Sequence, residues 1–154
     1  MARLELMTPP ERKHLEDTPC PVFGTHPFVT GSPLNRRRVA VLSTAGLHAR
    51  KDRPFTLTPG DFYRVIPGDI QASDLVMSHV SANFDRSGFA RDWNVVFPLD
   101  RLKELAKDGV IGSVADFHYA FMGANDPMQL EGEARKLAGL LKKDRVDALL
   151  LLPV

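Results

Sequence analysis

Short apolar runs, separated by polar turns and by two amphipathic segments, dominate the pattern of this chain. The run Val39–Leu42 is continuous, and the polar residues 43–46 break it, as expected for a buried strand that enters a tight turn. A second, nearly continuous aliphatic run covers 148–152 and is typical of a strand covered on both faces. Less continuous runs predict further strands at 62–66, 74–78, 94–97 and 117–122.

Two segments instead have the period of a helix. Residues 100–108 place Leu102, Leu105 and Ala106 on one face, and Gly109 follows the last turn. This pattern predicts a helix of two to three turns.

The second helix is predicted to begin at Asp126, because Asp126 precedes Pro127 and stands three residues before Gln129, in the manner of a capping box. Its apolar stripe is Leu130, Ala134, Leu137 and Leu141, and it is expected to end near Lys143. Strand, helix and strand in this order predict a right-handed βαβ unit. The predicted fold class is therefore α/β, with an open, mostly parallel sheet, flanking helices and an incomplete C-terminal side.

Proline divides the chain into an arm and a domain. Residues 1–35 contain Pro9, Pro10, Pro19, Pro21, Pro27 and Pro33, which disfavour regular structure and predict an extended arm. The remaining residues, 36–154, are expected to form one α/β domain, since 154 residues suffice for a single core.

Composition excludes several classes of protein. A content of 44% hydrophobic and 25% charged residues is that of a folded chain, and a net charge of +1 offers no field that would attract nucleic acid. The longest apolar run, 148–154, is far shorter than a bilayer span, and the first residues lack a signal peptide. We therefore expect a cytoplasmic protein without membrane contact.

The chain has a single cysteine, Cys20. A single cysteine excludes an internal disulfide, and Cys20 is interpreted as inert.

Residues that follow the apolar runs are the candidates for chemistry, because parallel sheets bind ligands at the carboxyl ends of their strands. The candidates for substrate binding are Ser43, Thr44, Gly46 and His48, and those for catalytic support are His79 and Asp85. Ser43, Thr44, Gly46, His48 and His79 are predicted to line one cleft. For His48 and His79, a functional imidazole and a hydrogen-bonded structural one stay open as alternatives, whereas His118, inside a strand run, is interpreted as structural.

The turn at 43–46 offers main-chain N–H groups to an anion. It has the spacing of neither a phosphate-binding loop with lysine nor GxGxxG, so a carboxylate is the better ligand. The histidines, with Asp69 and Asp85, lack the spacing of metal ligands, and no metal site is predicted.

Several longer motifs carry a resemblance to a known family. They are STAGLH at 43–48, YRVIPGD at 63–69, SHVSANFDRSGFARDWNVVFPLDRL at 78–102, GVIGSVADFHYAFMG at 109–123 and VDALLLLPV at 146–154. Together they resemble the selenoprotein B family of glycine, sarcosine, betaine and D-proline reductases over residues 38–154. The resemblance implies a selenocysteine or cysteine that attacks the α-carbon of an amino acid or betaine. An amine then leaves, and a carboxymethyl-selenoether passes to a partner selenoprotein.

The resemblance also implies roles and partners. Thr44, Gly46 and His48 would bind the carboxylate of a small carboxylated amine, and His79 with Asp85 would orient it or supply a proton. Partner reductase subunits are implied, and a homo-oligomer is compatible with them. The family places its redox residue after the strand that corresponds to VDALLLLPV, so a selenocysteine or cysteine is expected after Val154, with no other cofactor within the chain. We expect the 154 residues to be a truncated and inactive form of a longer protein, ended at a selenocysteine codon, a trimmed boundary or a natural terminus.

Two hypotheses of function follow. The first is the substrate-binding component of a selenocysteine- or cysteine-dependent reductase that cleaves a C–N bond. The alternative is a non-catalytic α/β domain that binds a small carboxylate or a subunit and lacks the nucleophile.

Overall fold

The structure is a computed structural model that describes residues 4–17, 22, 24, 26, 28–56, 60–81, 84–123 and 127–154. Its α-helices are α1 (Pro9–Glu16), α2 (Ser87–Arg91), α3 (Leu99–Lys107) and α4 (Glu131–Lys143). Its strands are β1 (Arg38–Ser43), β2 (Leu47–Ala49), β3 (Tyr63–Pro67), β4 (Leu75–Met77), β5 (Ser113–Val114), β6 (Phe117–Phe121) and β7 (Ala148–Leu152). Short 3-10 helices cover Leu4–Leu6, Leu34–Arg36, Ala72–Asp74, Trp93–Val95 and Pro127–Leu130.

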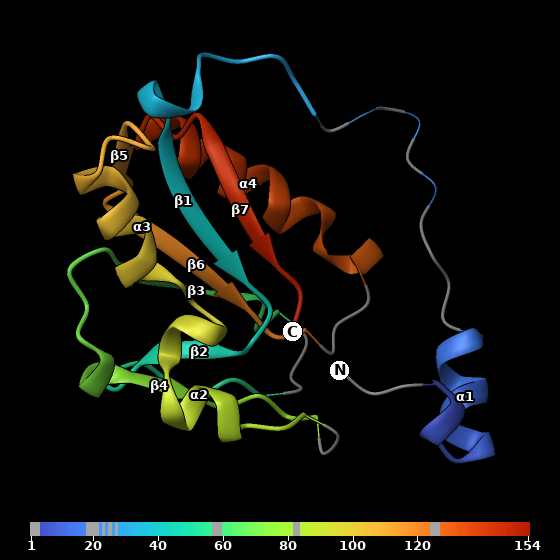
Figure 1. Ribbon diagram of the computed structural model, residues 1–154. Coiled ribbons are helices and arrows are strands. Elements are labelled where there is room, and N and C mark those ends of the chain that lie inside the picture. The colour runs from blue at the N-terminus through green and yellow to red at the C-terminus, as the bar shows by residue number, and fades with distance from the viewer. Residues whose placement is uncertain are drawn as a thin grey trace.

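Strand β1 lies at the centre of the main sheet (Figure 1). On one side it pairs in parallel with β7 along its length, from Val39 with Ala148 to Ser43 with Leu152. On the other side its first residues pair with β5 and its last with β6, again in parallel. Strand β3 pairs antiparallel with β6 and forms the far edge. The prediction of an α/β fold with a mostly parallel sheet is confirmed.

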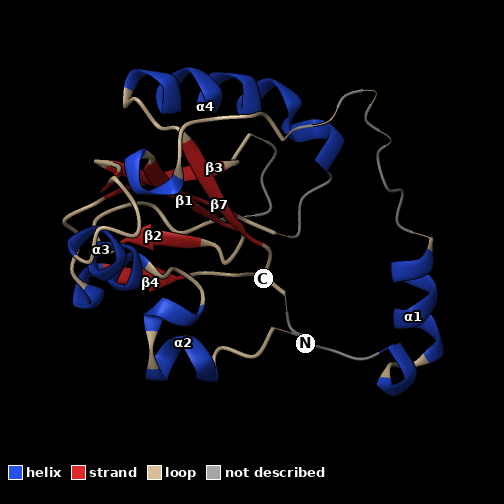
Figure 2. Cartoon of the chain, turned by 45° about the horizontal axis from the view of Figure 1, so that its top comes forward, coloured by secondary structure: helices blue, strands red, loops and turns tan. Residues whose placement is uncertain are grey.

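The two faces of the sheet bury different side chains. On one face, the β1 residues Val39 and Val41 pack in a core with residues of β2, β4 and α3, such as Leu102, and with Phe97, which precedes α3. On the other face, Tyr119 and Phe121 pack with Leu137 of α4. Figure 2 shows the resulting layers, with α4 along one side of the sheet and α2, α3 and the β2–β4 pair on the other.

Strand β4, predicted at 74–78, lies outside the main sheet. It pairs antiparallel with β2, from Leu47 with Met77 to Ala49 with Leu75. The apolar run therefore predicted a strand correctly but gave no information about its partner, since hydrophobic pattern does not encode pairing.

The strand predicted at 94–97 is wrong, because Trp93–Val95 form a 3-10 helix. Side-chain hydrogen bonds hold this turn: the main-chain N–H and the side-chain amide of Asn94 both donate to an Asp92 carboxylate oxygen at 2.9 Å. The Asn94 amide also donates to Asp100 at 3.0 Å. Local capping by Asp and Asn competes with strand formation here.

Helix α4 follows the predicted stripe in part. Leu137 is buried and Leu130 and Leu141 are partly buried, but Ala134 is exposed. The predicted capping residue Asp126 lies outside the described residues, and Pro127–Leu130 form a 3-10 turn before the α-helix begins. The expected end near Lys143 is confirmed.

Strand β7 is confirmed, but the prediction that both of its faces are covered is wrong. Its Leu151 side chain is 62% exposed. The reason is its position, since among the described strands β7 pairs only with β1 and so lies at an edge of the sheet.

The predicted arm contains regular structure, so the expectation of an extended chain is wrong for 9–16. The Thr8 main-chain N–H and hydroxyl donate to the Glu11 carboxylate at 3.0 and 2.7 Å, and the first of these is the glutamate half of a capping box for α1. Pro9 and Pro10 stand in the first turn, where helical N–H groups have no partner within the helix, so proline costs little there. The boundary between arm and domain at residue 35 stays a prediction.

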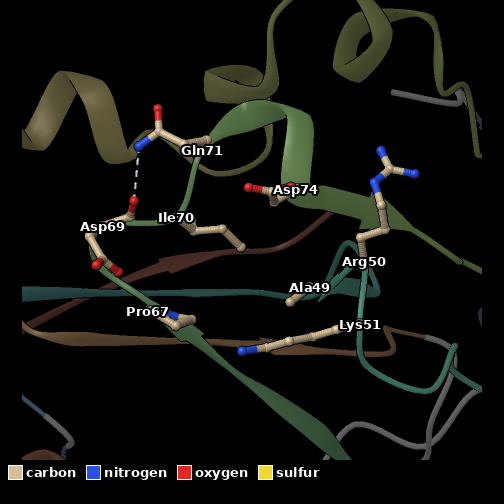
Figure 3. Close-up of a pocket in the computed structure, with 8 residues that line it drawn as sticks. All are labelled: Ala49, Arg50, Lys51, Pro67, Asp69, Ile70, Gln71 and Asp74. Carbon is tan, nitrogen blue, oxygen red and sulfur yellow. Dashed lines mark hydrogen bonds between the residues drawn. The ribbon is translucent and has the colours of Figure 1, made fainter.

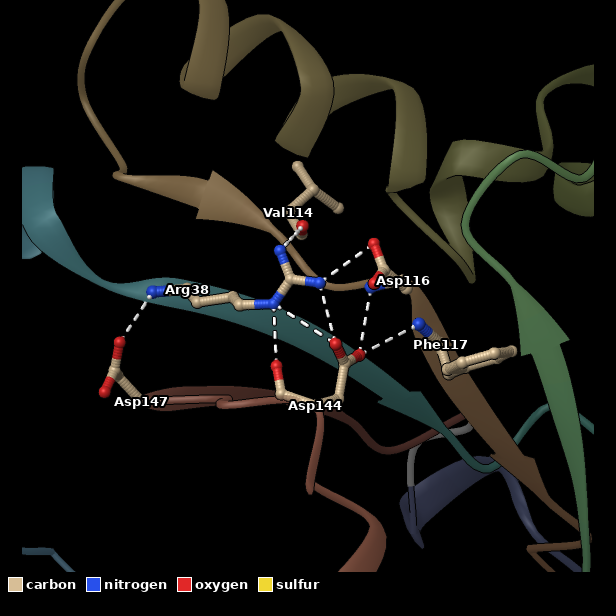
Figure 4. Close-up of polar contacts among 6 residues, drawn as sticks. All are labelled: Arg38, Val114, Asp116, Phe117, Asp144 and Asp147. Carbon is tan, nitrogen blue, oxygen red and sulfur yellow. Dashed lines mark hydrogen bonds and ion pairs between the residues drawn. The ribbon is translucent and has the colours of Figure 1, made fainter. Parts of the chain in front are cut away.

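An ionic cluster around Arg38 joins the amino ends of the central strands (Figure 4). The Arg38 guanidinium donates to the Asp144 carboxylate at 2.7 Å and to the Val114 carbonyl at 2.8 Å, and pairs with Asp116 at 2.9 Å. The other Asp144 carboxylate oxygen accepts from the main-chain N–H groups of Asp116 and Phe117. Burial raises the pKa of Asp144, but the hydrogen bonds from Arg38 and the main chain outweigh it, so the pKa lies below its usual value. This cluster links β1, the start of β6 and the turn before β7.

Candidate functional site

The carboxyl end of β1 lies between the ends of its two neighbours. The Thr44 N–H donates to the Leu152 carbonyl at 3.1 Å, and the Gly123 N–H donates to the Thr44 carbonyl at 3.0 Å. The Thr44 hydroxyl accepts from the Val154 N–H at 2.8 Å. Thr44 therefore marks the point where β1, β6 and β7 meet at the carboxyl edge of the sheet.

Gly46 brings a second segment to this edge. Its φ of 64° lies in the left-handed region, and a Cβ there would lie 2.9 Å from Met122 Cε and 3.1 Å from His79 Cα. The Cα atom of Gly46 is therefore within about 5 Å of the His79 Cα atom. Thr44 is two residues before Gly46, and two residues span about 7 Å at most, so the Cα atoms of Thr44 and His79 are within about 12 Å of each other. The structure thus brings the predicted residues Thr44, Gly46 and His79 together.

His79 is buried and held in one tautomer. Its ring packs against Phe84 at a centroid distance of 4.8 Å and an interplanar angle of 37°, and its Nδ1 accepts from the Ser81 N–H at 3.1 Å. The proton of the neutral ring is therefore on Nε2, and Nε2 has no hydrogen-bond partner among the described residues. Burial, and then the charge of Arg86, lower the pKa of His79, so the ring is neutral at pH 7. It offers an unused N–H donor rather than a base.

Arg86 is the residue of this site that sequence reasoning missed. Its Nη2 donates to the carbonyl of His79 and, at 3.4 Å, to that of Ser81. A guanidinium has five N–H groups, and among the described residues only Nη2 of Arg86 donates a hydrogen bond. Arg86 lies in the motif at 78–102, but only the structure shows that the loop turns back and brings Arg86 to His79. We call Thr44, Gly46, His79, Phe84 and Arg86 the His79–Arg86 cluster.

The other predicted residues have different surroundings. Ser43 is fully buried, and its hydroxyl accepts from the Ala45 N–H at 3.2 Å. His48 is also buried: its Nδ1 donates to the Ala49 carbonyl at 2.8 Å, and its Nε2 has no partner among the described residues. In register it pairs with Val76 in the β2–β4 sheet.

Asp85 is exposed and belongs to the start of α2, where it accepts from the Ser87 main chain at 2.8 Å and from the Ser87 hydroxyl at 3.0 Å. These hydrogen bonds lower the pKa of Asp85, so it is ionised at neutral pH and is a poor proton donor.

Two cavities, of about 490 and 480 Å³, are lined by Pro67 and Asp69 at the other end of the sheet, and none of the predicted site residues lines either. Within the described ranges, no three His, Cys, Asp or Glu side chains are grouped as a metal site requires. No helix in the same part of the chain is long and apolar enough to cross a bilayer.

Comparison with known proteins gives consistent matches. Residues 34–153 match the family described as glycine/sarcosine/betaine reductase selenoprotein B. The chain is 38% identical over 116 residues to D-proline reductase subunit gamma of Acetoanaerobium sticklandii, which covers 73% of this chain and 47% of that protein. It is 27% identical over 139 residues to sarcosine reductase complex component B subunit beta of Peptoclostridium acidaminophilum, covering 86% and 32%.

A further relative is glycine reductase complex component B subunit gamma of Symbiobacterium thermophilum, 28% identical over 124 residues, covering 77% of this chain and 28% of that protein. The chain thus spans less than half the length of these curated relatives. No solved structure matches. The family match covers the whole His79–Arg86 cluster, and the chain belongs to the glycine/sarcosine/betaine reductase selenoprotein B family.

Proposed function

We propose that this chain is the substrate-binding component of a selenocysteine- or cysteine-dependent reductase that cleaves the C–N bond of a small amino acid or betaine. Membership of the family supports the reaction class. Two groups beside Thr44 at the carboxyl edge support the assignment of the site: the Arg86 guanidinium, which donates to the His79 carbonyl, and the buried His79 Nε2–H, which has no partner among the described residues.

In this proposal the substrate carboxylate lies against Arg86 and His79. The guanidinium supplies charge-assisted hydrogen bonds, and the neutral His79 ring adds its Nε2–H without a competing proton transfer. Phe84 stacks on the imidazole and limits its rotation. Binding of this kind would fix the position of the α-carbon, which is what an attacking nucleophile requires.

The nucleophile would be a selenocysteine or cysteine positioned after Val154. Val154 contacts the Thr44 hydroxyl, so a residue shortly after it would reach the same edge of the sheet. The selenolate or thiolate forms a bond to the α-carbon, and the electron pair of the C–N bond leaves with the nitrogen. A substrate ammonium then departs as a neutral amine and needs no further proton. The single cysteine of the chain, Cys20, lies outside the described residues and is not assigned this role.

Calorimetric titration of the chain with glycine, sarcosine, betaine and D-proline tests the proposal. At least one of them should bind, and Arg86→Met should weaken its binding about tenfold or more, as expected for the loss of a charged hydrogen bond. Arg101→Met is the matched control, because Arg101 is exposed and pairs with Glu104 on α3.

Equal binding by Arg86→Met and the unaltered chain would refute the role of the cluster. Tight binding without any reductase activity, in a protein that carries a selenocysteine or cysteine after Val154, would favour the non-catalytic alternative instead.

A further inference from the structure

The cavity of about 490 Å³ lies at the opposite end of the sheet from Thr44, between the end of β2 and the turn that follows β3 (Figure 3). Its apolar part consists of Ala49, Pro67 and Ile70. The volume lies in the range that holds small ligands. We call this cavity the Lys51–Asp74 pocket.

Hydrogen bonds fix the walls of the pocket. The Arg50 guanidinium donates to the Ser73 carbonyl at 3.2 and 2.7 Å, and the Arg50 N–H donates to the Asp74 carbonyl at 2.7 Å. On the other wall, the Gln71 amide donates to the Asp69 carbonyl at 3.0 Å. These contacts hold β2 against the turn before β4, so a ligand would meet a preorganised site.

Three charged side chains around this rigid frame are left without partners. The Lys51 ammonium and the carboxylates of Asp69 and Asp74 make no hydrogen bond or ion pair with another residue in the part of the chain that the structure describes. Figure 3 shows Lys51 extending along the pocket toward Pro67, while the Asp74 carboxylate points inward from the opposite wall, near Ile70. One wall thus carries the unpaired Lys51 ammonium and the other carries the two carboxylates, with apolar side chains between them, while the Arg50 guanidinium is bound to the Ser73 carbonyl.

We propose that the Lys51–Asp74 pocket binds a small zwitterion, with its anionic group on Lys51, its ammonium group on Asp74 and Asp69, and its carbon chain on Ile70. A ligand with only a negative charge would meet two carboxylates, and one with only a positive charge would meet Lys51. A dipolar ligand avoids both repulsions. This site shares no residue with the His79–Arg86 cluster and is independent of the proposed reductase function.

The test is an NMR titration of the whole ¹⁵N-labelled chain with glycine, 4-aminobutyrate and 6-aminohexanoate, which differ in the separation of their charges. Butyrate and butylamine are the single-charge probes. At least one zwitterion should shift the amide signals of Ala49, Ile70 and Gln71, and it should bind more tightly than either single-charge probe.

Matched variants locate the binding. Lys51→Met and Asp74→Asn alter exposed side chains and should each weaken binding about tenfold, while Lys107→Met, an exposed lysine on α3, should change it less than about twofold. Retained signal dispersion shows that each variant is folded.

Four results would overturn the inference: no shift with any zwitterion, equal binding of butyrate, equal binding of butylamine, or unchanged binding by both pocket variants. Arg86→Met separates the two proposals, because it should weaken substrate binding at the His79–Arg86 cluster and leave the shifts at Ile70 unchanged.

Discussion

Protonation of His118 is expected to control the stability of this protein at mildly acidic pH. His118 is fully buried in β6, and its Nδ1 accepts a hydrogen bond from the Val41 N–H at 3.0 Å. Val41 lies between the part of β1 that pairs with β5 and the part that pairs with β6. The imidazole therefore accepts the Val41 N–H in place of a carbonyl of a neighbouring strand. The Ala115 carbonyl lies near the ring, but Nε2 has no hydrogen-bond partner among the described residues. Protonation of Nδ1 would abolish the bond to Val41.

The magnitude follows from the pKa. Burial, only partly offset by the charge of Asp144, lowers the pKa of His118 from 6.5 to about 4. Between these two pH values the unfolded chain binds a proton at His118 and the folded chain does not. The stabilisation is therefore complete above pH 6.5 and is lost as the pH falls to about 4. A shift of this size corresponds to a decrease in the free energy of unfolding on the order of 3 kcal/mol.

Urea unfolding, followed by circular dichroism from about pH 4 to about pH 7.5 in steps of about half a pH unit, measures this effect. His118→Asn is the test variant, since the Asn Oδ1 can accept from Val41 and does not titrate. Its stability should decrease much less between pH 6.5 and 4 than that of the unaltered chain. His26→Asn, at an exposed position, is the control for removal of a histidine outside the sheet. Parallel curves for His118→Asn and the unaltered chain would refute the reasoning.

Two further substitutions test the contacts that shape the sheet, each by chemical denaturation. Gly46→Ala should lower the free energy of unfolding by roughly 1–3 kcal/mol, because φ is 64° and the new methyl group would crowd His79. Gly139 lies within α4, and a Cβ there would meet open space, so Gly139→Ala should instead raise the free energy of unfolding by about 0.5–1 kcal/mol. Changes of the same sign for Gly46→Ala and Gly139→Ala would contradict the argument. Asp144→Asn should cost on the order of 2 kcal/mol, since it leaves Arg38 partly buried with a weaker partner. Glu104→Gln, in a surface ion pair, should lower the free energy of unfolding by less than about 0.5 kcal/mol. A similar loss for Asp144→Asn and Glu104→Gln would show that the Arg38 cluster stabilises the protein no more than a surface ion pair does.

The sequence predicted the elements of the fold better than their pairing. Continuous apolar runs identified β1 and β7, and helical periodicity identified α3 and α4, because burial imposes these patterns locally. The separate β2–β4 sheet was not predicted, since pairing depends on contacts between distant residues. Trp93–Val95 was wrongly predicted as a strand because polar capping, rather than the apolar pattern, determines the local backbone.

The candidate site was predicted only in part, because it too depends on contacts between residues that are distant in the sequence. The rule that ligands bind at the carboxyl ends of strands selected Thr44, Gly46 and His79, and the structure places these three together. The same rule could not show that the Ser43 hydroxyl turns into the core. Arg86 escaped prediction because its contact with His79 depends on a loop whose path has no periodic signal.

The Arg38 cluster has a consequence for the internal motion of the sheet. It ties the amino ends of β1, β6 and β7 with charged hydrogen bonds, whereas the carboxyl ends of these strands are joined mainly by single main-chain hydrogen bonds around Thr44. Local opening should therefore start at the carboxyl edge, and amide protons of Leu152 and Gly123 should exchange with solvent faster than those of Val39 and Phe117. The edge that carries the His79–Arg86 cluster can then separate and close while the opposite end keeps the strands in register.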